Sequence, residues 1–123
     1  TILLLWQLNL FKGESMDHLN ITEKKGDNYI LLEIVGTVNS YTYTEFQQKV
    51  YSIIKTTNLI LDMGRVTNLS SSGLGVLMSA VEDGEEAGTK LYIMSPSDIV
   101  RLAIESTGFQ HLFPVIRSVG EVM

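Results

Sequence analysis

The residues best suited to chemistry in this sequence are the serines and glycines of positions 68–75, which read Asn-Leu-Ser-Ser-Ser-Gly-Leu-Gly. They stand where an apolar run at 59–63 gives way to a helical pattern. The N-terminus of a helix presents free backbone N–H groups and a positive dipole end, so it suits an anion or a phosphoryl group. Capping is the alternative interpretation, because serine stabilises a helix start and glycine permits close packing. The local sequence leaves both interpretations open.

Other catalytic and metal-binding patterns are missing. The Gly-Lys-Ser/Thr of a phosphate-binding P-loop and the Gly-x-Ser-x-Gly of a hydrolase nucleophile elbow do not occur. The chain has no cysteine, which excludes disulfides, thiolate catalysis and Cys-rich zinc sites. His18 and His111 lie far apart in sequence, so a hydrolase built on Ser71 or Ser72 has no placed base. We expect no enzymatic activity, no metal and no cofactor.

Composition indicates one globular domain that does not bind nucleic acid. The 123 residues are 45% hydrophobic, which is enough to bury a core. The formal net charge is −5, and the nine Lys and Arg residues form no basic cluster. A nucleic-acid-binding surface would need such a cluster.

Residues 2–11 read ILLLWQLNLF, a strongly apolar stretch. Ten residues are too few for a transmembrane helix, which needs about twenty, and a signal peptide would have a basic start and a small-residue cleavage site. The stretch reads as an upstream translation start, an expression remnant, or an extra strand or helix that covers an apolar surface. We treat residues 1–15 as an extension and 16–123 as the domain, with Met16 as its natural start. We expect a cytoplasmic protein without membrane insertion.

Hydrophobic patterning then divides the chain into alternating strands and helices. Residues 19–23 and 29–35 are separated by a turn and predict a hairpin. The apolar run at 59–63 predicts a strand that is buried on both sides, and the run at 91–94 predicts another buried strand. Residues 114–116 are a candidate for a last short strand.

Amphipathic helices are predicted between these strands. The first has an apolar stripe of Tyr43, Phe46, Val50, Ile53 and Ile54. The second starts near 70–72 and ends at 84–88, and its predicted stripe is Leu74, Leu77, Met78 and Val81. The alternation predicts an α/β fold with a mixed sheet, whose later strands are parallel and joined by right-handed helical crossovers.

The third helix is predicted from a start signal and a stop signal. Ser95 is the expected N-cap, with Pro96 in the first turn and Asp98 three residues after the cap. Gly108 is the expected stop. The predicted buried positions are Ile99, Leu102, Ala103 and Ile104.

Three motifs, in this order, resemble those of the anti-sigma factor antagonists of the STAS family. Positions 36–42 (GTVNSYT) are similar to the family's Gly-x-Leu-Asp-x-x-Thr loop. Positions 70–75 (SSSGLG) are similar to its Asp-Ser-Ser/Thr-Gly-Leu-Gly signature, and positions 95–109 to its Ser-Pro-x-Val-x-x-Leu…Ser-Gly segment. The resemblance spans roughly residues 19–123 and implies a single STAS-like domain.

The resemblance also implies a function and a site. In that family the serine after the aspartate, here Ser71, is phosphorylated by the cognate anti-sigma factor, a serine kinase of the GHKL type. Binding of the unphosphorylated protein to this kinase would release a sigma factor. A homodimer stays open. The residues implied in partner binding are Asn39, Ser40, Tyr41, Thr42, Ser70, Ser72, Gly73, Leu74 and Gly75.

Two departures from the family pattern concern charge. Ser70 and Asn39 stand where the family has aspartates, so two negative charges near Ser71 are lost. A phosphate at Ser71 would face less repulsion, but the kinase would lose carboxylates that orient the serine. An alternative function therefore stays open, that of a non-phosphorylated STAS scaffold subunit in a stressosome-like or transporter complex.

Overall fold

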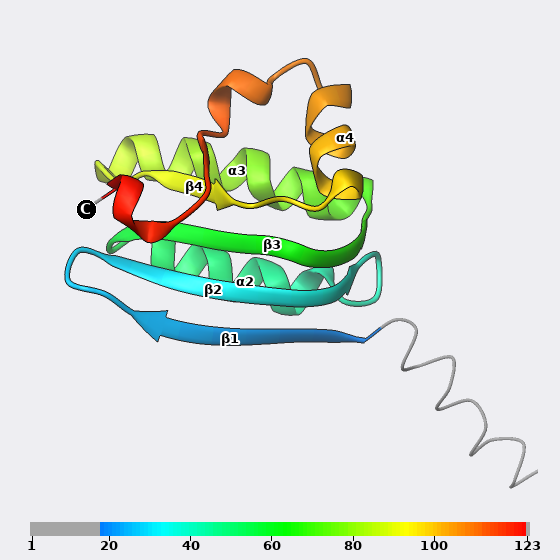
Figure 1. Cartoon of the computed structure of the whole chain (residues 1–123), viewed down its shortest axis with the longest axis horizontal. Helices are drawn as coiled ribbons and strands as arrows, with labels where there is room; N and C mark the ends of the chain where they lie inside the picture. The colour runs from blue at the N-terminus through cyan, green and yellow to red at the C-terminus, as the bar shows by residue number, and fades with distance from the viewer. Residues whose placement is uncertain (1–17, 123) are drawn as a thin grey trace, which may run out of the picture.

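The computed structural model describes residues 18–122, so the predicted extension 1–15 lies outside the described residues. Within them, five strands form one sheet in the order β1-β2-β3-β4-β5 (Figure 1). β1 pairs with β2 antiparallel, and the remaining neighbours are parallel, which confirms the predicted mixed sheet with an opening hairpin. The strands are β1 Leu19–Lys25, β2 Tyr29–Val38, β3 Asn58–Leu69, β4 Leu91–Met94 and β5 Val115–Ile116.

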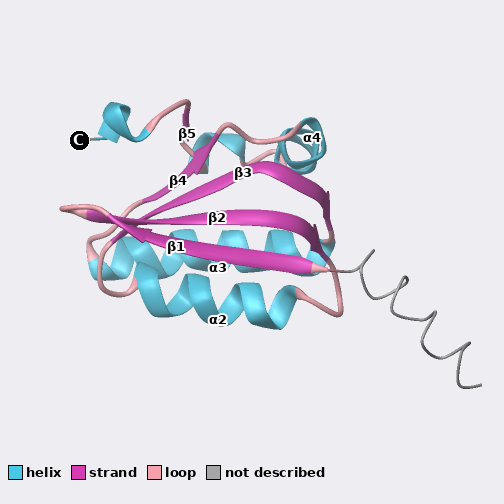
Figure 2. Ribbon diagram, turned by 60° about the horizontal axis from the view of Figure 1, so that its bottom comes forward, coloured by secondary structure: helices cyan, strands magenta, loops and turns pink. Residues whose placement is uncertain are grey.

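Two helices, α2 and α3, lie side by side against one face of the sheet (Figure 2). A shorter helix, α4, packs against β3. The crossovers β2-α2-β3, β3-α3-β4 and β4-α4-β5 account for the parallel pairing. The helices are α2 Tyr43–Ile54, α3 Ser71–Ala87 and α4 Asp98–Ser106, and short 3₁₀ turns follow at Gln110–Leu112 and Val119–Val122.

The core lies mainly between the sheet and the helices. Successive strand residues point to opposite faces, so Leu32 and Leu61 join the helix-side core while Leu31 and Ile60 join a smaller cluster on the other face. Ile116 completes that smaller cluster. Every buried side-chain nitrogen or oxygen of residues 18–122 has a hydrogen-bond partner. No helix in this range is long and apolar enough to cross a membrane.

β3 is longer than predicted, because it continues beyond residue 63 as far as Leu69. Past Asp62, β3 pairs with β2 but no longer with β4. Two register shifts, between Glu33 and Val35 and between Gly36 and Thr37, interrupt regular alternation there. Residues 64–69 of β3 are partly polar and pair irregularly, so hydrophobic patterning could not reveal this part of the strand.

The buried stripe of α3 differs from the prediction. Leu77 is buried as expected, but Leu74, Met78 and Val81 are only partly buried. Small residues occupy the closest contacts: a Cβ at Gly84 would lie 2.9 Å from the Thr89 carbonyl oxygen. The buried residues of α3 are Gly73, Val76, Leu77, Ala80 and Gly84. The prediction looked only for large apolar residues, but small residues are buried where α3 approaches its neighbours closely.

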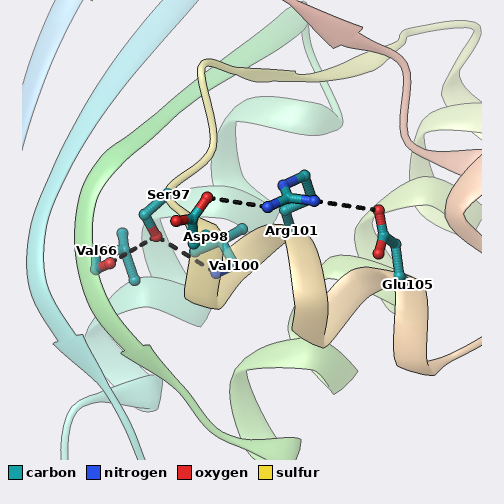
Figure 3. A network of polar contacts seen from close by, with 6 residues as sticks. All are labelled: Val66, Ser97, Asp98, Val100, Arg101 and Glu105. Atoms are coloured by element: carbon teal, nitrogen blue, oxygen red, sulfur yellow. Dashed lines mark hydrogen bonds and ion pairs between the residues drawn. The ribbon is translucent and has the colours of Figure 1, made fainter.

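The cap of α4 is Ser97, not Ser95 as predicted. Ser97 Oγ accepts a hydrogen bond from the Val100 N–H at 3.3 Å and donates one to the Val66 carbonyl at 2.7 Å (Figure 3). Ser95 instead is the first residue after β4 and has a φ of 47°. Its backbone N–H donates to the Ile116 carbonyl, so pairing with β5 delays the helix start. The predicted stop is confirmed, since α4 ends at Ser106 and Gly108 has a φ of 76°.

The buried face of α4 also differs from the prediction. Val100 and Ile104 are buried, whereas Ile99 is 47% and Leu102 is 57% exposed. A nine-residue helix that packs on the end of a sheet contacts the core with a narrow face only. On its polar side, Arg101 lies 3.0 Å from Asp98, and this hydrogen bond raises the pKa of Arg101 (Figure 3).

Replacement of Ser97 by alanine is expected to lower the free energy of unfolding by about 1 kcal/mol. The change removes the α4 cap and leaves the Val66 carbonyl without its side-chain donor. Urea denaturation measures the effect. The adjacent Asp98→Ala variant is the control, because its exposed ion pair with Arg101 adds little stability. Equal stability of the Ser97→Ala variant and the wild type would contradict the assignment of the cap.

Candidate functional site

The pairing of β2 with β3 brings two separate loops together. Val38 and Leu69, the last residues of the two strands, are register partners, and the Ser70 N–H donates to the Val38 carbonyl at 2.8 Å. The loop 39–42 and the start of α3 therefore emerge side by side from the carboxyl ends of parallel strands. This edge is where α/β folds commonly bind ligands and partners.

The start of α3 is capped by Ser70. Its hydroxyl accepts from the Gly73 N–H at 3.3 Å, and its carbonyl accepts from the Leu74 N–H at 2.9 Å. Ser71 is the first residue of the helix and is exposed, whereas Ser72 is half-buried. Capping therefore falls on Ser70, while its neighbour Ser71 is exposed.

The two glycines of this motif differ in their surroundings. A Cβ at Gly73 would lie 2.6 Å from Leu69 Cδ1 and 2.7 Å from Val38 Cγ1. A Cβ at Gly75 would have no atom within 4 Å. Gly73 therefore lets the first turn of α3 lie directly on the ends of β2 and β3, while Gly75 is an exposed position in the helix.

Asn39 organises the neighbouring loop. Its side-chain oxygen Oδ1 accepts from the Tyr41 N–H at 2.8 Å and from the Thr42 N–H at 3.1 Å. Thr42 Oγ1 accepts from the Asn39 N–H at 2.9 Å and donates to the Thr37 carbonyl at 2.7 Å. Thr42 is the N-cap residue of α2, but its hydroxyl bonds to the loop rather than to the helix. Ser40 and Tyr41 are exposed, Tyr41 to 83%.

The two charge-removing departures keep the oxygen acceptors that the fold uses. Asn39 accepts through an amide oxygen, and Ser70 accepts through a hydroxyl, where the family pattern has carboxylates. Loop geometry therefore does not need a negative charge at either position.

Replacement of Asn39 by aspartate is expected to leave stability near that of the wild type, while Asn39→Ala is expected to cost about 1 kcal/mol. Aspartate retains the acceptor for the Tyr41 and Thr42 N–H groups, and alanine removes it. Urea denaturation at neutral pH compares the two variants. An aspartate variant as unstable as the alanine variant would show that the amide group itself is required.

Sequence reasoning missed two supporting residues at this edge. Thr37 is buried, and its hydroxyl lies 3.3 Å from that of Thr67 on β3, which links the ends of the two strands. The signal available in the sequence was a threonine near the end of each of two strands, since threonines on neighbouring strands can hydrogen-bond to each other.

Residues 18–122 contain no group of three or more His, Asp or Glu that could hold a metal ion.

Comparison with protein families finds the STAS domain over residues 18–122. A curated relative is the anti-sigma-B factor antagonist of Staphylococcus aureus, strain NCTC 8325. The two chains are 24% identical over 100 residues, which cover 80% of this chain and 93% of the relative.

Solved structures share the fold. An anti-sigma factor antagonist from Mycobacterium paratuberculosis has a TM-score of 0.72 at 21% identity, covering 85% of this chain and 91% of that one. SpoIIAA, a Bacillus cell fate determinant in its phosphorylated form, has a TM-score of 0.67 at 14% identity, covering 84% and 96%. At these identities the likeness establishes the architecture of the chain.

Proposed function

This chain belongs to the STAS-domain family, and on that premise we propose that it is an anti-sigma factor antagonist that acts by binding. The unphosphorylated protein binds an anti-sigma factor, a serine kinase of the GHKL type, and so releases a sigma factor in the cytoplasm. The binding surface comprises the loop 39–42 and residues 70–75. The observation that carries the proposal is the hydrogen bond from Ser70 to Val38, which joins both parts and leaves Ser71 exposed beside them.

Phosphorylation of Ser71 is the proposed switch. The kinase transfers the γ-phosphoryl group of ATP to Ser71 Oγ, so an O–P bond forms at serine, the bond to the ADP oxygen breaks, and the hydroxyl proton leaves. The product carries about −1.5 to −2 additional charge. The N-terminus of α3 tolerates this charge in the free protein. In the complex, the bulk and the charge disrupt the interface.

Mass spectrometry after incubation with ATP and the cognate kinase tests the proposal. The wild type should gain one phosphate, the Ser71→Ala variant should gain none, and the Ser72→Ala variant should still gain one. A wild type of unchanged mass, with a kinase that is active on itself or on another substrate, would refute the switch. Phosphate gained by the Ser71→Ala variant would refute the assignment to Ser71.

A second candidate function is that of a non-phosphorylated scaffold subunit. The neutral Asn39 and Ser70 favour it. They keep the hydrogen bonds of the fold but lack the carboxylates by which a kinase would recognise the serine. A pull-down separates the candidates: a kinase recovered together with a sigma factor supports the antagonist, and stressosome or transporter subunits support the scaffold.

The Asn39→Asp/Ser70→Asp double variant should be phosphorylated faster than the wild type if the kinase recognises these carboxylates.

A further inference from the structure

The edge of β4 that faces β5 is only partly covered. β5 has two residues, and the Ile93 N–H of β4 donates to the Pro114 carbonyl just before it at 2.9 Å. On the other side of β4, the Leu59 N–H of β3 donates to the Lys90 carbonyl. Successive residues of a strand face opposite neighbours with their backbone groups. The N–H and C=O of Leu91 therefore point toward the β5 side, as those of Ile93 do.

The pairing with β5 does not reach Leu91. Residue 114 is the position whose N–H would meet the Leu91 carbonyl, but it is a proline and has no N–H. The preceding residues, Gln110–Leu112, form a 3₁₀ turn rather than a longer β5. Within residues 18–122, no hydrogen bond of this edge engages Leu91. Leu91 is only 4% exposed, and backbone groups at buried positions normally have a partner. The edge thus offers one donor and one acceptor to a ligand.

A groove of about 400 Å³ lies beside this edge. Its volume is within the range of small-ligand sites, roughly 300–1,000 Å³. The apolar side chains that line it come from α3, from β4 and from the segment before β5, and they are Val81, Leu91, Leu112 and Pro114. Burial against such walls favours an apolar group of a ligand.

The groove also carries one charge of each sign. Glu85 of α3 and Lys90, the residue before β4, both line it and are both exposed. Neither side chain takes part in an ion pair within the described range 18–122. A zwitterionic ligand can meet both charges, whereas a ligand with charge of one sign only is repelled by one of them.

We propose that this groove binds a short free peptide with a central apolar residue. The N–H of that residue donates to the Leu91 carbonyl and its C=O accepts from the Leu91 N–H, as opposed residues do in an antiparallel ladder. Its side chain lies against the apolar walls. The antiparallel register sets the next residue of the peptide beside Lys90. In a tripeptide that next residue carries the terminal carboxylate, which therefore lies near the Lys90 ammonium group.

The groove is separate from the proposed antagonist surface. Leu91 pairs with Leu59 at the start of β3, whereas the loop 39–42 and residues 70–75 follow the end of β3 at Leu69. The length of β3, roughly 30 Å, separates the two sites. The proposed peptide site therefore does not depend on the antagonist function.

An NMR titration of the ¹⁵N-labelled full chain with the tripeptide Ala-Leu-Ala tests the proposal. The Leu91 amide signal should move downfield and reach saturation, because this N–H gains an acceptor. An analogue with N-methylleucine lacks the donor for the Leu91 carbonyl and should bind about tenfold more weakly. Ala-Ser-Ala should bind at least about tenfold more weakly, because the apolar side chain is lost.

A variant of the chain tests the charge at the groove. Lys90→Gln should bind Ala-Leu-Ala about threefold more weakly than the wild type, and its affinity for the C-terminal amide of this peptide should equal that of the wild type. Lys55→Gln is the matched control: Lys55 is an exposed lysine outside the groove, so both peptides should bind this variant as they bind the wild type.

Three results would overturn the proposal. The first is a Leu91 signal that does not move with Ala-Leu-Ala or moves without saturation. The second is equal binding of Ala-Leu-Ala and its N-methylleucine analogue, which would show that the Leu91 carbonyl takes no part. The third is equal binding of Ala-Leu-Ala and its C-terminal amide to the wild type, which would indicate an internal segment of a protein instead of a free peptide.

Discussion

Replacement of Gly73 by alanine is expected to lower the free energy of unfolding by about 1–3 kcal/mol. Alanine normally stabilises a helix relative to glycine by about 1 kcal/mol. At position 73 the added Cβ would instead lie 2.6 Å from Leu69 Cδ1 and 2.7 Å from Val38 Cγ1. Those atoms are side-chain carbons at the ends of two paired strands, so either these side chains or the start of α3 must shift.

Gly75→Ala is the matched control in the same turn of the same helix. Its Cβ would meet no atom within 4 Å, so we expect stabilisation by about 0.5–1 kcal/mol. Urea denaturation of both variants against the wild type gives the comparison. If both substitutions stabilise the protein equally, the close approach of α3 to β2 and β3 is not a requirement of the fold.

Gly73→Ala should also weaken partner binding if the proposed function holds. Where the added Cβ is accommodated by a shift of the first turn of α3, Ser71 moves relative to the loop 39–42. A surface made of two loops loses its shape when one of them moves. Gly75→Ala keeps the position of α3 and reports separately whether partner contacts include the exposed position 75.

Replacement of Ser71 by glutamate is the second prediction with a large effect: binding of the anti-sigma factor should weaken by about 100-fold or more, because an uncompensated charge in an interface costs several kcal/mol. The stability of the free protein should hardly change. Position 71 is exposed, and an acidic residue in the first turn of a helix interacts favourably with the dipole. Isothermal titration calorimetry measures the binding, and urea denaturation measures the stability.

Ser52→Glu is the matched control for this prediction. Ser52 is an exposed serine on α2, outside the loop 39–42 and the start of α3, so the same charge there should leave the affinity unchanged. Equal weakening by both substitutions would show that net charge, rather than position 71, governs binding. Unchanged affinity of the Ser71→Glu variant would remove Ser71 from the interface.

Most of the architecture could be predicted from local patterns. The alternation at the start of the hairpin 19–35 and the stripe of α2, with Phe46 and Val50 fully buried, correspond to periodicities of two and 3.6 residues. The strand 91–94 follows from a continuous apolar run. The errors occurred where a neighbour in space overrides the local pattern. Pairing with β2 extends β3 to Leu69, and the pairing of Ser95 with Ile116 moves the α4 cap to Ser97.

The sequence by itself determined the alternation of strands and helices and the position of the serine motif, because both depend on residues that are close along the chain. Tertiary structure alone decided that Ser70 caps while Ser71 is exposed, that Gly73 is crowded while Gly75 is open, and that Asn39 holds its loop through an amide oxygen. It also exposed Ile99 and Leu102, which periodicity had assigned to the core. These differences arise from the parallel register of β2 and β3 and from the narrow contact of α4, which bring together residues about thirty positions apart.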